Sequence, residues 1–120
     1  MNIDDIVTTE DLRLLADIGF IAGSRGSGDQ ANAIFAAIRV LRPNQEAGFL
    51  GSAMVHILAG DPDAAIKELN GAPATTATKT FLGIALLLNG STFDGREALN
   101  SVIETAPGTA FARLAQNTLR

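Results

Sequence analysis

Few side chains in this sequence have types and spacings that could carry chemistry. His56 is the only histidine and cysteine is absent. A zinc site needs several His, Cys or carboxylate ligands, so we predict no metal ion and interpret His56 as a packing residue of an apolar helix.

Asp61 and Asp63 flank Pro62. A helix start explains both carboxylates, because Asp caps a helix and acidic side chains interact favourably with the helix dipole.

A glycine-rich stretch at residues 23–28 (GSRGSG) is the other chemical candidate. It follows a predicted helix instead of a strand, and it lacks the lysine of a phosphate-binding loop. We therefore interpret it as a turn. The sequence predicts no nucleotide, no other cofactor and no enzymatic activity.

The composition points to helices that pack closely through small side chains. The chain has 120 residues, enough for one domain, and 47% of them are hydrophobic. Aromatic residues are only 5%, all phenylalanine, so alanine and leucine supply most of the apolar content. The net charge is −4 with nine Lys and Arg and no basic stripe, which argues against nucleic-acid binding.

The ends and the hydropathy of the chain predict a soluble protein. The first residues (MNIDD) are acidic where a secretory signal would be basic. The longest apolar run, residues 81–88, is too short to cross about 30 Å of hydrocarbon as a helix. We expect a cytoplasmic protein that does not insert into membranes.

Small residues recur at matching places along the chain and define a repeat. Each of three helical segments holds one small residue, a second small residue twelve positions later, and a bulky residue four positions beyond that. The three sets are Gly19, Ala31 and Phe35; Ala53, Ala65 and Leu69; and Gly83, Gly95 and Leu99. Small residues let two helix backbones approach closely where they cross. A lone helical glycine costs about 1 kcal/mol relative to alanine, so Gly19 and Gly83 need such a packing reason.

The repeat predicts an all-α domain over residues 1–120. We expect antiparallel helix pairs at about residues 10–43, 44–73 and 74–107, followed by a capping helix at 109–119. The second helix of the middle pair should be about one turn short, because Pro73 follows it early.

The spacing resembles the signature of tetratricopeptide repeats. The resemblance rests on Ile18-Gly19, Ala31, Phe35 and Pro43, and again on Leu82-Gly83, Leu99 and Pro107. It implies an α-solenoid of about three repeats that binds proteins. The sequence departs from the family pattern where Tyr and Ala are usual; the residues there are Ala22, His56, Leu86 and Gly95.

In tetratricopeptide stacks the first helix of each pair lines a concave groove. Counting from Gly19, Ala53 and Gly83, the predicted partner-binding residues are apolar: Phe20, Leu50, Met54, Ile57, Leu58, Ile84, Leu87 and Leu88. Grooves of this family that grip a C-terminal carboxylate use Lys, Arg and Asn, which are missing here. An apolar groove suits an amphipathic helix. The alternative is that a terminal segment of the chain or a second copy, as a homodimer, fills the groove.

A narrower resemblance is to the small tetratricopeptide-type proteins of bacterial type III secretion systems, namely the needle-subunit chaperones and the Hrp-type components. The segment ANAIFAAIRVLRP at residues 31–43 is similar to their first repeat. The resemblance implies a co-chaperone that keeps a self-assembling, secreted subunit monomeric, together with a helper subunit. The alternative is a self-associating structural or adaptor protein of another assembly.

Overall fold

The computed structural model describes residues 18–19, 26, 28–41 and 46–120. Within these residues the chain forms helices and no strand, which confirms the predicted all-α class. The helices are α3 (Gly28–Leu41), α4 (Ala47–Leu58), α5 (Pro62–Asn70), α6 (Thr76–Leu88), α7 (Thr92–Thr105) and α8 (Ala110–Leu119). Across this described part, no helix is both long and apolar enough to cross a membrane.

Local sequence signals set the helix boundaries. Asp61 is the N-cap of α5, as predicted: its carboxylate accepts a hydrogen bond from the Ala64 N–H at 3.2 Å, and Pro62 is the first helical residue. Thr75 opens α6 by accepting from the Thr78 N–H while its own N–H donates to the Thr78 hydroxyl. The turns before α5 and α7 contain Gly60 and Gly90 at φ of +79° and +91°, which favour glycine.

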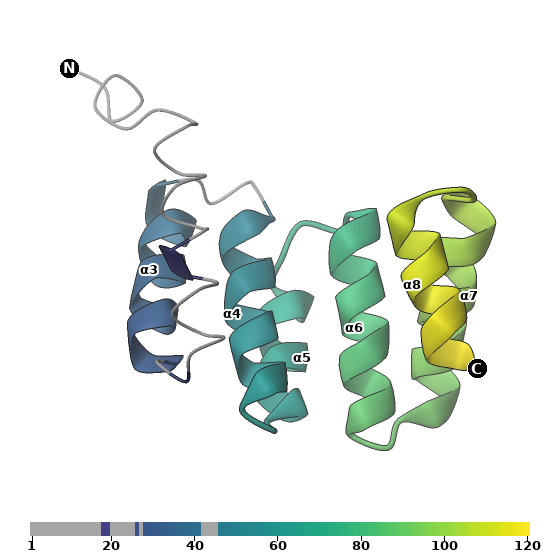
Figure 1. The fold of residues 1–120 in the computed structure, drawn as a ribbon, viewed down its shortest axis with the longest axis horizontal. Coiled ribbons are helices and arrows are strands. Elements are labelled where there is room, and N and C mark those ends of the chain that lie inside the picture. The colour runs from purple at the N-terminus through teal and green to yellow at the C-terminus, as the bar shows by residue number, and fades with distance from the viewer. Residues whose placement is uncertain (1–17, 20–25, 27, 42–45) are drawn as a thin grey trace.

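The helices stack as antiparallel pairs in two rows (Figure 1). α4, α6 and α8 stand side by side in the front row, with α5 and α7 behind them. α4 packs against α5 and α6 against α7, and each front helix also contacts the next one in its row. α5 has 9 residues where α3 and α7 have 14, so the middle pair has the short second helix that Pro73 predicted.

The small residues of the repeat are buried at helix crossings. Ala31, Ala53 and Ala65 are 0% exposed, and the three glycines of the set are also buried. A Cβ on Gly83 would lie 2.8 Å from two side-chain carbons of Leu99, closer than carbon atoms pack. The packing reason predicted for Gly83 is therefore present. Gly48 and Gly51 lie outside the predicted repeat positions, yet a Cβ at either would collide with the side chain of Arg39 or Phe35 in α3.

The capping carboxylate of α5 gives a first testable prediction. Replacing Asp61 with alanine should lower the free energy of unfolding by about 1 kcal/mol, because the Ala64 N–H loses its acceptor. Ser91 holds the same place at α7 but makes no side-chain capping hydrogen bond. The matched variant Ser91→Ala should therefore change the unfolding free energy by less than about 0.5 kcal/mol. Urea denaturation followed by circular dichroism measures both, and equal losses in the two variants would contradict the assignment.

Candidate functional site

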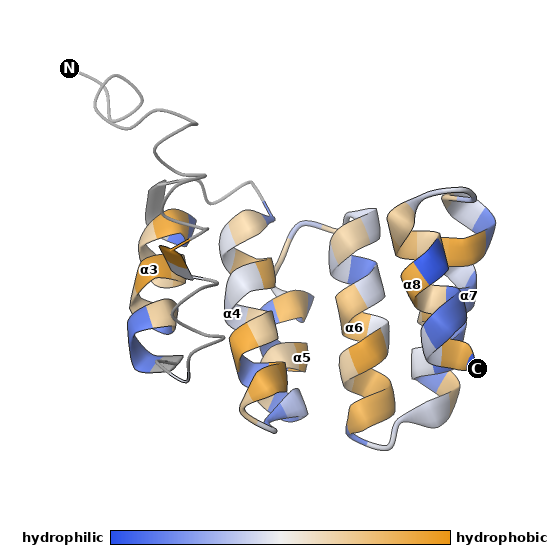
Figure 2. Ribbon diagram, in the orientation of Figure 1, coloured by the Kyte–Doolittle hydropathy of each residue, from blue (hydrophilic) through white to orange (hydrophobic). Residues whose placement is uncertain are grey.

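α4 and α6 are apolar along most of their length, as Figure 2 shows. His56 is the only titratable residue of α4, and Lys79 is the only one of α6. Both point toward the back row: His56 lines a pocket with residues of α5, and the Lys79 ammonium donates to the Ser101 hydroxyl of α7 at 3.3 Å. The front side of these two helices therefore carries no charged side chain.

A stripe of apolar side chains runs along the front of α4. Leu50, Met54 and Leu58 are spaced by four residues, so they lie on one side of the helix, one turn apart. His56 lies two residues from both Met54 and Leu58, which turns it about 200° away from each. Because His56 faces α5, Met54 and Leu58 face away from α5. Leu58 is 68% exposed, Met54 is half-buried, and Leu50 packs at the edge of the core.

α6 continues this surface. Ile84 and Leu88 are also four residues apart, and Leu82, two residues before Ile84, faces a pocket lined by α5 residues. Ile84 and Leu88 therefore face away from α5 as well. Leu88 is 58% exposed and stands 30 residues after Leu58, at the same place in the next repeat. We call the surface formed by Leu50, Met54, Leu58, Ile84 and Leu88 the front face.

Two of the predicted groove residues point largely into the protein. Ile57 is half-buried and packs against the cluster of Ala53, Ala65, Leu69 and Ala85. Leu87 is half-buried against the C-terminal cluster, and a Cβ on Gly95 would lie 2.9 Å from its Cδ2. Phe20 falls outside the described residues. Of the eight predicted residues, the other five lie on the front face, where Leu50 and Ile84 are half-buried and also pack against the two core clusters.

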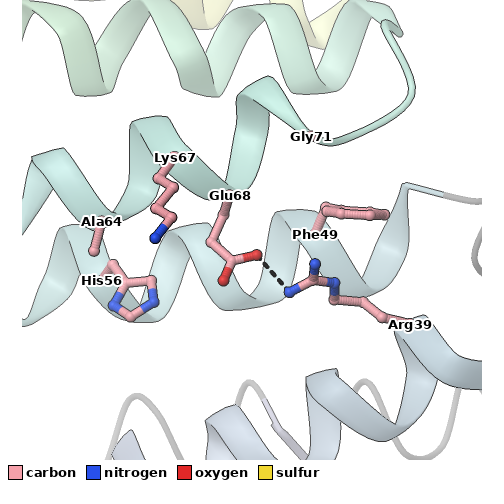
Figure 3. A pocket seen from close by; sticks show the side chains of 7 residues that line it. All are labelled: Arg39, Phe49, His56, Ala64, Lys67, Glu68 and Gly71. Carbon is pink, nitrogen blue, oxygen red and sulfur yellow. Dashed lines mark hydrogen bonds and ion pairs between the residues drawn. The ribbon is translucent and has the colours of Figure 1, made fainter.

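A pocket of about 340 Å³ lies on the other side of α4, between α3, α4 and α5 (Figure 3). The Arg39 guanidinium donates to the Glu68 carboxylate at 2.5 Å, and its central carbon lies 4.3 Å from the centre of the Phe49 ring. The other lining residues are His56, Ala64, Lys67 and Gly71. Nowhere in the described part of the chain do three or more His, Asp or Glu side chains gather as a metal site would require.

Sequence reasoning missed this pocket for a physical reason. Arg39 and Glu68 are 29 residues apart on separate helices, and their partnership leaves no local pattern. The only sequence signal for this pair is that Arg39 and Glu68 each lie near the end of the second helix of a helix pair.

The comparison with solved structures identifies the fold. The chain is similar to a structure described as "NMR structure of the first TPR domain of the human RPAP3 protein", with a TM-score of 0.74 and 17% sequence identity. The match covers 90% of this chain and 91% of that one. No protein-family model matches the sequence, and no curated protein matches it. The similarity confirms the tetratricopeptide-like arrangement of helix pairs that the repeat predicted.

Proposed function

We propose that this tetratricopeptide-like protein is a scaffold that holds an amphipathic helix of another protein against its front face. One observation carries the proposal: Leu58 and Leu88 are largely exposed at equivalent places on two adjacent helices that have no charged side chain on that side. Exposed apolar side chains that gather on one face mark interaction sites. Met54 adds a side chain that adapts to different partners.

The arrangement of the front face suits a helix more than an extended peptide. The described residues include no sheet edge to which a strand could be added. Adjacent packed helices lie about 8–10 Å apart, so a third helix can rest on the leucines of both. Burying about 600 Å² of apolar surface would contribute on the order of 15 kcal/mol before the costs of association.

The finer proposal concerns the kind of partner. Residues 31–43 resemble the first repeat of the type III secretion group. We infer that the protein is a cytoplasmic co-chaperone or component of such a system, which holds a secreted or self-assembling subunit with a helper subunit. Covering the apolar side of that subunit's helix would prevent its polymerisation. The observation that supports this role is an apolar face that lacks the charges of a carboxylate clamp.

A double substitution on the front face tests the proposal. Leu58→Glu with Leu88→Glu should weaken binding of an amphipathic helix at least tenfold, a loss of about 1.4 kcal/mol, while the helical content is retained because both side chains are exposed. Leu87 is avoided, since it is half-buried and a carboxylate there would disturb the core. The probe is a labelled peptide with leucine at i, i+3, i+4 and i+7 and only Gln and Ser elsewhere, followed by fluorescence anisotropy.

Phe93 offers a matched control for this experiment. It is 76% exposed and lies in the first turn of α7, two residues before Gly95, which faces α6. Its side chain therefore points away from α6. Phe93→Glu should leave peptide binding unchanged. Equal loss in the control, or binding retained by the double variant, would refute the front-face assignment. If the wild-type protein instead forms a concentration-dependent dimer in light scattering that the double variant lacks, the alternative role as a self-associating protein is favoured.

A further inference from the structure

The pocket behind α4 has hydrogen-bond donors that the protein itself does not use. The Lys67 ammonium and the His56 imidazole make no hydrogen bond or ion pair with any described residue. In Figure 3 the Lys67 side chain reaches into the space between α5 and α4, toward the His56 ring. Arg39 gives one hydrogen bond to Glu68, and a guanidinium has five N–H donors.

The packing around Arg39 fixes where these donors lie. The Phe49 ring lies under the guanidinium and the Glu68 carboxylate lies beside it. The two contacts come from different helices, so they hold Arg39 in one orientation at the pocket wall. A group that is already ordered loses less conformational entropy when a ligand binds.

The pocket has the opposite charge to the protein as a whole. Arg39, Lys67 and the single carboxylate of Glu68 all line the pocket, which gives it one net positive charge, while the chain carries −4. Arg39 and Lys67 are two of the six Lys and Arg residues among those the structure describes. Low-polarity walls, here Phe49 and Ala64, strengthen the attraction of a fixed charge for an anion.

We propose that this pocket binds a carboxylate side chain from an acidic segment of a protein partner. The carboxylate would lie between Lys67 and His56, and the positive charge of Arg39 at the other end of the pocket would add to the attraction of the acidic segment. This inference does not depend on the front face, because His56 turns away from Met54 and Leu58. The two surfaces lie on opposite sides of α4, so both can be occupied at once.

The test uses the full chain labelled with ¹⁵N, followed by NMR. The probe is a short peptide of glutamates, with the same peptide made of glutamine and inorganic phosphate as comparisons. The glutamate peptide should move the amide signals of residues 64–71 and the imidazole signals of His56, and the shifts should weaken as salt is added. The glutamine peptide should leave these signals in place.

Two lysine variants decide whether the pocket is responsible. Lys67→Glu should weaken binding of the glutamate peptide at least about tenfold, since it reverses the charge inside the pocket. Lys79→Glu makes the same change in net charge outside the pocket, where Lys79 bonds Ser101, and should retain binding within about twofold. The inference is overturned by an absence of shifts at the pocket, by equal weakening in both variants, or by phosphate acting at the same concentration as the peptide.

Discussion

Replacing Phe35 with alanine is expected to lower the free energy of unfolding by about 3–5 kcal/mol. Phe35 is 0% exposed, and its ring lies against Gly19 and Gly51, which come from two other segments of the chain. The truncation removes this buried ring and leaves a cavity, because glycines have no side chain that could move in to fill it. A domain of this size is stabilised by about 5–15 kcal/mol in total, so the variant should lose at least about a fifth of its stability.

Phe93 provides the matched control for this prediction. It is also a phenylalanine, but it is 76% exposed on α7. Phe93→Ala should change the unfolding free energy by less than about 0.5 kcal/mol. Both values come from urea denaturation followed by circular dichroism. A loss below about 1 kcal/mol in Phe35→Ala would show that the ring is not a central contact between α3 and α4.

Substitution of Gly51 by alanine should destabilise the protein by about 2 kcal/mol, although alanine favours helices. The added Cβ would collide with three ring carbons of Phe35, and that ring is fully buried and also confined by Gly19. Overpacking of this kind costs about 1–3 kcal/mol, with the upper end expected for so severe a collision. The gain in helix propensity of about 1 kcal/mol offsets only part of this cost.

Gly71 is the control glycine for that experiment. Its φ is −89°, and a Cβ there would meet only the Glu68 carbonyl oxygen at 3.7 Å, an ordinary contact. Gly71→Ala should therefore be neutral or stabilising by up to about 1 kcal/mol. In a double-mutant cycle, Gly51→Ala should cost less when Phe35 is already leucine, because the aromatic ring is gone. An equal cost in both backgrounds would mean that the collision with Phe35 is not the cause.

These contacts bear on function because they set the orientation of α4. Gly48 and Gly51 hold one side of α4 against α3, while Ala53 meets the core formed with α5 and α6. With those sides fixed, the stripe of Leu50, Met54 and Leu58 is the apolar side of α4 that remains for a partner. A variant that loosens α3 from α4 should therefore weaken binding at the front face as well as stability.

The two surfaces of α4 also differ in what they can recognise. The front face is apolar and without charge, which suits a hydrophobic helix. The pocket behind it combines two cations with one carboxylate, which suits an acidic segment.

Much of this fold was predictable because the relevant signals are local. The cap at Asp61-Pro62, the turns at Gly60 and Gly90, and the small residues at fixed spacing each act within a helical turn or at one helix crossing. By itself, the sequence therefore determined an all-α protein built from antiparallel helix pairs, with a short second helix in the middle pair. It also determined that α4 and α6 carry almost no charge.

Only the tertiary structure decided which side of these helices a partner can reach. Ile57 and Leu58 are neighbours of similar hydrophobicity, yet Ile57 packs against the core and Leu58 is 68% exposed. A helix that is apolar nearly all round gives no periodic signal for its buried side, so the positions of its neighbours settle the question. The pair of Arg39 and Glu68 depends on the stacking in the same way: the two residues meet only because α3 and α5 pack around α4.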